Sequence, residues 1–216
     1  MTRRRTFTDN SVSYAAVGAT QAADVLVFPP AGFSAAQAEH RIGSSEQRFE
    51  TAADLLLSWG MQRGSHLALI SVEEAADLGY VGLTYDATGN VISRDAAAHE
   101  VQYSADGTPY VSSGAVVEIR GVWPLHKKPQ SYRVIYVIRE QRRVGFALGT
   151  MSDTPVSGEE FFGVEWREDD SVWAVVRSVT AIAPTRPYKL LTPAIRLWQW
   201  YRRRHYARVL APVRAS

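Results

Sequence analysis

The sequence predicts an α+β fold in which a curved antiparallel β-sheet packs against a long C-terminal helix, with a shorter helix near the N-terminus. Between residues 133 and 182, four runs of strand-forming residues are joined by turns too short for a crossover, which leaves only antiparallel pairing. The last 24 residues then carry apolar side chains at helical spacing. With 216 residues the chain can fill one domain, expected over residues 12–211 behind a disordered tail at 1–11.

The first helix is expected at about residues 45–60. Ser44 and Gln47 have the spacing of a capping box, in which each side chain accepts from or donates to the other's backbone. Gly60 and Gly64 are plausible helix ends. The apolar residues that fall on one face of this helix are Phe49, Ala52, Ala53, Leu56 and Trp59.

Strand-like segments follow this helix. Leu67 to Val72 is a short apolar run, and the sequence between residues 86 and 131 is compatible with either strands or loops. Turn residues in this region separate the candidate strands at 81–85, 91–93, 100–103 and 110–122.

A meander forms the strongest β signal, with strands expected at 133–139, 145–151, 159–167 and 172–182. Alternation places Phe162, Val164 and Trp166 on one face and their neighbours on the other. Gly145 and Gly149 interrupt one strand, which favours a bulge or an aromatic ring, such as that of Trp198 or Tyr201, lying over the missing side chains.

The C-terminal helix is expected to start at Thr192 as its cap, with Pro193 in the first helical position. Arg196, Arg203 and Arg204 are expected nearer solvent. The stripe expected to be buried contains Ile195, Trp198, Tyr201, Arg202, His205, Tyr206 and Val209.

Several kinds of site are excluded or unsupported. The chain has no Cys, which excludes disulfides and thiolate chemistry, and its five His residues show no metal-ligand spacing. Neither a Walker loop nor a Gly-x-Gly-x-x-Gly or Gly-x-Ser-x-Gly motif occurs. We therefore expect no metal and no cofactor. No apolar run could span a membrane and no signal peptide is evident, so a cytoplasmic location is expected.

The stretch Gly145–Phe162, GFALGTMSDTPVSGEEFF, resembles an uncharacterised family, the domain of unknown function number 1990. The shared features are the strand Arg133–Val137, Gly145–Thr150 and Gly158–Glu160, and similarity extends to the early helix and the terminal helix. Thr154 stands where the family has a loop His. The family implies no activity. Its arrangement is similar to the helix-grip (START or Bet v 1-like) class of hydrophobic-ligand binders, an analogy of fold alone.

The leading hypothesis is a non-catalytic protein that holds a small apolar ligand between the sheet and the C-terminal helix. Glu159 and Glu160 are adjacent in a strand, so they must face opposite sides and cannot share one substrate atom. Arg133, Arg142 or Arg143 is the expected ion-pair partner of one of them. The candidate ligand-binding residues are Trp59, Arg133, Tyr136, Phe146, Thr150, Glu159, Glu160, Phe162 and Trp198.

Two alternatives remain open. A carboxylate in the cavity could perform acid–base chemistry on a small hydrophobic substrate. Alternatively, the basic end of the chain could bind a partner, because residues 171–216 contain nine Arg or Lys and no Asp or Glu. Peripheral contact with an anionic membrane then fits better than nucleic acid, which we do not expect as a partner. The same charge asymmetry also arises when a basic helix packs on its own acidic domain.

Overall fold

The computed structural model describes residues 12–73, 84–85, 91–92, 103, 107, 109–121, 128–151 and 154–212. Residues 1–11, for which a tail was expected, lie outside the described residues, as do most of the candidate strands between 74 and 106. Within the described part of the chain, no helix is both long and apolar enough to cross a membrane.

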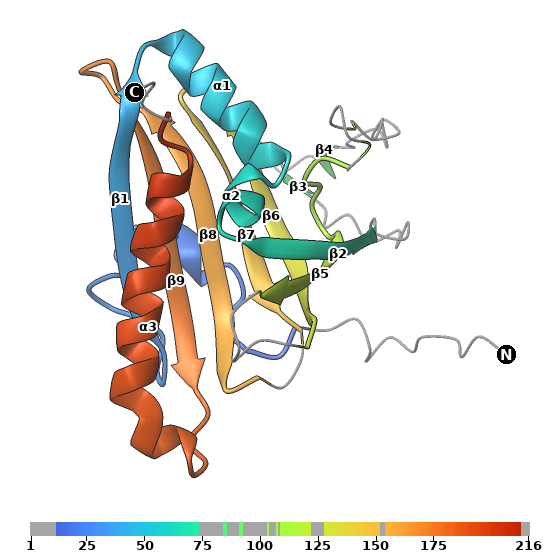
Figure 1. Cartoon of the computed structure of the whole chain (residues 1–216), viewed down its shortest axis with the longest axis vertical. Coiled ribbons are helices and arrows are strands. Elements are labelled where there is room, and N and C mark those ends of the chain that lie inside the picture. The colour runs from blue at the N-terminus through green and yellow to red at the C-terminus, as the bar shows by residue number, and fades with distance from the viewer. Residues whose placement is uncertain are drawn as a thin grey trace, which may run out of the picture.

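A seven-stranded antiparallel sheet forms the centre of the molecule, in the order β1-β9-β8-β7-β6-β5-β2. The helices lie on one face of this curved sheet, with α3 running along β1 and β9 and α1 crossing its upper end (Figure 1). We call this the helix-side face and the opposite one the outer face. The strands are β1 Ser34–Ser44, β2 Leu67–Glu73, β5 Val116–Gly121, β6 Gln130–Glu140, β7 Arg143–Thr150, β8 Val156–Trp166 and β9 Ser171–Ile182.

This arrangement confirms the predicted α+β fold and its four-stranded meander. Phe162 of β8 pairs with Phe146 of β7 on one side and with Val176 of β9 on the other. Alternate residues of these three strands, the even-numbered ones, therefore share the helix-side face. They form one core cluster with the apolar side of α1. A separate pair of short strands, β3 Thr84–Tyr85 and β4 Val91–Ile92, falls within two of the candidate strands.

The first strand, β1, was not predicted. Its sequence, SAAQAEHRIGS, is mostly small or charged and lacks β-branched residues apart from Ile42. Pairing with β9 from Ser34 to Ser44 makes it a strand, so its structure depends on a partner more than 120 residues away in the sequence. Ser44 is therefore the end of a strand.

The predicted capping box is wrong because Ser44 belongs to strand β1. Helix α1 spans Glu46–Leu57 with Ser45 as its N-cap, and no side chain caps it. The five apolar residues predicted for its inner face are all buried, but Trp59 lies beyond the helix. Trp59 adopts a left-handed conformation (φ 65°) that separates α1 from the short helix α2, Gly60–Gly64.

The C-terminal helix α3 spans Tyr188–Val209, so the predicted start at Thr192 is wrong and Pro193 lies inside the helix. Its buried stripe is also rotated from the predicted one. Tyr201 is 64% exposed, whereas Arg203, expected near solvent, is 9% exposed. Polar contacts explain the rotation, because Arg203 donates to Ser178 and Gln199 to Thr180, both at 3.1 Å on the helix-side face of β9.

Residues 12–33 cover the outer face of the sheet, where the segment passes behind the strands in Figure 1. It contains one short 3-10 turn, η2 Ala19–Gln21. Phe161 and Tyr14 lie over the glycines of β7: an added Cβ would come within 2.5 Å of the Phe161 ring at Gly145 and 2.4 Å of the Tyr14 hydroxyl at Gly149. Aromatic packing over these glycines was predicted, although Trp198 and Tyr201 were the wrong residues.

Candidate functional site

Glu160 and Arg202 form an ion pair between the sheet and the C-terminal helix. Arg202 Nη2 donates to Glu160 Oε2 at 2.9 Å, and the side chains of Arg202 and Glu160 are 25% and 14% exposed. The expectation that Arg133, Arg142 or Arg143 would pair with this carboxylate is wrong, because Glu160 lies on the helix-side face with Phe162. The pair joins the middle of β8 to α3.

Each partner of this ion pair also has an unused polar atom. Glu160 Oε1 and Arg202 Nε are shielded from solvent and have no hydrogen-bond partner within the described residues. A buried acceptor or donor without a partner costs about 1–3 kcal/mol, so native proteins nearly always supply one. The pair can therefore accept one further hydrogen bond and donate another.

A row of aromatic rings borders the ion pair along the helix-side face. Trp59 contacts Phe146, Phe146 contacts Phe162, and Phe162 contacts Tyr206 of α3, with ring centroids 5.5, 5.6 and 5.5 Å apart. All four side chains are buried. Trp198, one turn before Arg202, is partly buried and lies 4.7 Å from its guanidinium carbon. The polar pair is therefore placed in largely aromatic surroundings.

The low polarity of this region shifts the ionisation of its tyrosines. Burial raises the pKa of Tyr206, and the same cause raises the pKa of Tyr132, with the Glu160 carboxylate adding to both shifts. Burial alone would lower the pKa of Arg202, but Glu160 followed by Tyr206 and Tyr132 outweighs it, and the net shift is upward. Both tyrosines therefore stay neutral and Arg202 stays charged at neutral pH.

Glu159 lies on the outer face and holds the N-terminal segment. Its side chain is fully buried. Oε2 accepts from the Tyr14 hydroxyl at 3.0 Å and the Gly18 N–H at 2.7 Å, and Oε1 accepts from the N–H of Thr20 at 3.1 Å and from its hydroxyl. Four donors saturate this carboxylate, so it serves to attach residues 14–20 to the sheet.

Tyr136 belongs to the same cluster. The Thr20 hydroxyl gives its one proton to Glu159, so the Tyr136 hydroxyl, 2.6 Å away, must donate to Thr20. Burial raises the pKa of Tyr136 to about 12. Burial, followed by the charge of Glu159, also raises the pKa of Tyr14. Arg133 pairs across the sheet with Gly149 and so lies on this outer face as well.

The nine residues predicted for a ligand site therefore separate into groups. Trp59, Phe146, Phe162, Glu160 and Trp198 lie on the helix side, whereas Arg133, Tyr136 and Glu159 lie on the outer face. Thr150 sits at the end of β7, where its hydroxyl accepts from the Gly158 N–H at 3.0 Å and shares a hydrogen bond with Ser13. Arg202 was predicted to be buried, but its pairing with Glu160 was missed, because 42 residues separate the two and no local motif connects them.

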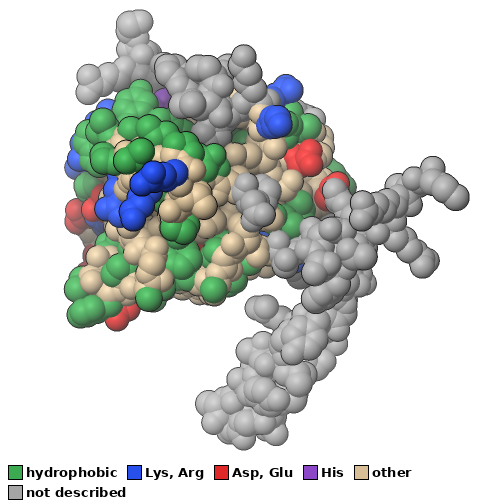
Figure 2. Space-filling view, turned by 90° about the horizontal axis from the view of Figure 1, so that it is seen from below, with side chains coloured by type: hydrophobic (Ala, Val, Ile, Leu, Met, Phe, Trp, Pro, Cys, Tyr) green, Lys and Arg blue, Asp and Glu red, His purple; other side chains and the backbone are tan. Residues whose placement is uncertain are grey.

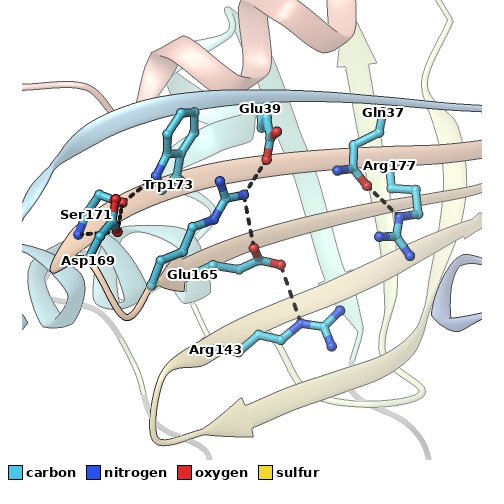
Figure 3. Close-up of polar contacts among 9 residues, drawn as sticks. Gln37, Glu39, Arg143, Glu165, Asp169, Ser171, Trp173 and Arg177 are labelled. Atoms are coloured by element: carbon cyan, nitrogen blue, oxygen red, sulfur yellow. Dashed lines mark hydrogen bonds and ion pairs between the residues drawn. The ribbon is translucent and has the colours of Figure 1, made fainter. Parts of the chain in front are cut away.

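A third set of polar contacts occupies the outer face near the β8–β9 turn. Arg143 pairs with Glu165, and Arg167 bridges Glu165 and Glu39, as Figure 3 shows. These side chains are about one quarter to two fifths exposed. Arg143 Nε, like Arg202 Nε, is shielded and has no hydrogen-bond partner within the described residues, but no carboxylate oxygen of this network is in that state, which is its contrast to the Glu160–Arg202 pair.

A comparison with known families gave a match over most of the chain. A family model described as "Domain of unknown function (DUF1990)" matches residues 13–107 and 92–209, which confirms the resemblance drawn from the sequence. Comparison with curated protein sequences found no match.

Solved structures match most of the chain at low sequence identity. A hypothetical protein from Helicobacter pylori matches 94% of this chain and 95% of its own with a TM-score of 0.51 and 7% identity, a likeness of fold alone. The protein TTHA0849 from Thermus thermophilus matches 82% of this chain and 93% of its own, with a TM-score of 0.46 and 11% identity. A truncated norcoclaurine synthase from Thalictrum flavum matches 84% of this chain and 96% of its own, with a TM-score of 0.42 and 12% identity.

Proposed function

The chain belongs to the family described as domain of unknown function DUF1990, and we propose that it is a non-catalytic binder of a small, largely apolar, neutral ligand held between the sheet and α3. The observation that carries this proposal is the Glu160–Arg202 pair, with Oε1 and Nε both lacking partners, within the described residues, in aromatic surroundings.

The chemistry of the two unused atoms defines the polar part of the ligand. Oε1 needs a donor and Nε–H needs an acceptor. A hydroxyl or an amide supplies both, whereas a ligand carboxylate would be repelled by Glu160. The rest of the ligand would be apolar, since burial of apolar surface contributes about 25 cal/mol per Å² before the costs of association.

The ion pair is more suited to binding than to catalysis. A general base must lie within hydrogen-bond reach of the proton that it removes and must be basic enough to take it, and pairing with a cation makes a carboxylate less basic. Glu159 is saturated by structural donors on the outer face, and Glu160 is held by Arg202. These contacts support a positioning role for Glu160, in which its carboxylate orients a polar group of the ligand.

The proposal can be tested with Nile red, a neutral apolar dye whose fluorescence rises in apolar sites. We expect saturable binding to the wild-type protein. The double variant Glu160→Gln/Arg202→Gln should weaken competition by alcohols and amides for the dye site, and the matched variant Glu165→Gln/Arg143→Gln on the outer face should not. Competition that is unchanged in both variants, or absent from the wild type, would overturn the proposal.

A further inference from the structure

A basic hollow lies between α3 and the outer edge of β1, and neither Glu160 nor Arg202 lines it. Its volume is about 380 Å³, and its walls include Ala38, His40, Trp200, Arg203, Arg204 and Arg208. Strand β1 ends the sheet order, so its outer edge pairs with no other strand among the described residues. The hollow thus has a helix on one side and an open strand edge on the other.

Carboxylates do not neutralise this hollow. Of the two other residues that line it, Glu39 turns to the outer face, where Arg167 binds it, and Gln37 accepts from Arg177 there (Figure 3). The ion pairs of arginine within the described residues include those of Arg143, Arg167 and Arg202, and none of these involves an arginine of the hollow. The three arginines of the hollow therefore have no counter-ion in the described part of the chain.

Arg203 makes this imbalance pronounced. It is 9% exposed and donates to the neutral Ser178 hydroxyl. Burial lowers the pKa of Arg203, and the more distant Glu160 offsets only part of that effect. Arg204 and Arg208 are one helical turn apart, a spacing at which like charges destabilise a helix. An anion in the hollow would offset both the burial of the Arg203 charge and the repulsion between Arg204 and Arg208.

The surface beside the hollow is apolar as well as basic. A second hollow of about 260 Å³ shares Trp200, Arg204 and Arg208 and adds Tyr201 and His205. Arg204 lies 4.2 Å from the Trp200 ring. Leu190, Leu197 and Tyr201 are 77%, 66% and 64% exposed and recur at intervals of seven and four residues along the solvent side of α3. At the lower end of the molecule, where α3 begins, Figure 2 shows hydrophobic side chains next to Lys and Arg side chains.

We propose that this surface binds the phosphate of an anionic phospholipid headgroup, with α3 lying along a bilayer. Arg203, Arg204 and Arg208 would surround the phosphate, while Leu197 and Tyr201 enter the interfacial layer. Exposed leucines beside arginines fit a lipid interface better than a nucleic acid, whose backbone offers them no apolar contact. This proposal rests on a different surface from the ligand site and goes beyond the proposed function.

The full-length protein should be sedimented with phosphatidylcholine vesicles that contain or lack phosphatidylserine. We expect binding only when phosphatidylserine is present, weaker at high salt. Arg204→Glu/Arg208→Glu should reduce the partition coefficient by about tenfold or more. The control Arg120→Glu/Arg139→Glu makes the same change in net charge at two exposed arginines of the sheet and should retain binding. Leu197→Ser/Tyr201→Ser should weaken binding without changing charge.

Three results would overturn the proposal. The first is absence of binding to vesicles that contain phosphatidylserine, and the second is an equal loss in the two charge-reversal variants. The third is binding of soluble glycerophosphoserine or duplex DNA as tight as that of the vesicles, which would identify a free phosphate or a nucleic acid as the partner. Unfolding curves of every variant should match the wild type, since all the substituted side chains are exposed.

Discussion

Glu159 and Glu160 are neighbours in β8, yet separate parts of the chain bury them on opposite faces of the sheet. Residues 14–20 cover Glu159 on the outer face, and α3 covers Glu160 on the helix side. Each carboxylate therefore attaches one end of the chain to strand β8. The two carboxylates differ in their hydrogen bonding. Glu159 accepts from four donors, whereas Glu160 keeps one oxygen without a hydrogen-bond partner within the described residues.

Substitution of Glu159 should release the N-terminal segment. Glu159→Gln replaces a charged acceptor of four hydrogen bonds by an amide whose NH₂ group faces donors, and we expect a loss of about 3 kcal/mol in the free energy of unfolding. The amides of Gly18 and Thr20 should exchange with solvent faster. Urea unfolding and hydrogen exchange measure these effects. Glu165→Gln, in a surface ion pair, should cost less than about 1 kcal/mol, and equal costs would contradict this account.

The Glu160–Arg202 pair should show energetic coupling. Arg202→Met leaves a largely buried carboxylate unpaired, which should lower the free energy of unfolding by about 3 kcal/mol. Glu160→Gln/Arg202→Met should lose less than the sum of the single variants, with a coupling energy of roughly 0.5–3 kcal/mol. A double-mutant cycle from urea unfolding gives this value. Additive losses would show that the two side chains do not interact.

Alkaline pH should destabilise the protein through its buried tyrosines. A tyrosine whose pKa is raised on folding keeps its proton above pH 10, the ordinary value, while the unfolded chain loses it. The free energy of unfolding should therefore fall from about pH 10 upward, through the Tyr136 value of about 12, by up to about 1.4 kcal/mol per pH unit for each such residue. Tyr206→Phe should flatten this slope, and exposed Tyr201→Phe should leave it unchanged.

Gly145 should not tolerate a side chain. A Cβ there would lie 2.5 Å from the Phe161 ring and 2.8 Å from the Phe162 carbonyl oxygen. Gly145→Ala should cost about 1–3 kcal/mol through overpacking. Adding Phe161→Leu should recover part of this loss, since it removes the ring but not the backbone contact. Thermal unfolding tests both variants, and an alanine variant as stable as the wild type would refute the predicted clash.

The sheet was predictable where residues of strong strand preference alternate between short turns, as they do from Arg133 to Ile182. The sequence of β1 has no such pattern, and only pairing with β9 defines it as a strand. Residue spacing located the inner face of α1, but the end of the helix depends on the left-handed conformation of Trp59, which packing against Phe146 favours. Local sequence patterns therefore predicted the elements whose structure depends on neighbouring residues, and they missed those that depend on distant partners.

The candidate site was partly predictable for the same reason. Strand alternation separates Glu159 from Glu160 without any structure. Their partners could not be found this way, because Tyr14 and Arg202 lie 145 and 42 residues from the carboxylates that they contact. The buried stripe of α3 was predicted only in part, because two polar residues, Gln199 and Arg203, face the sheet and bond to hydroxyl groups of β9.

Native mass spectrometry of the protein, purified under non-denaturing conditions from the organism that makes it, tests the ligand proposal most directly. We predict a bound neutral molecule that is released on denaturation, lost from Glu160→Gln/Arg202→Gln and retained by Glu165→Gln/Arg143→Gln. A measured wild-type mass equal to that of the polypeptide alone would contradict a ligand held at the Glu160–Arg202 pair. Equal retention of the molecule by the two variants would contradict it as well.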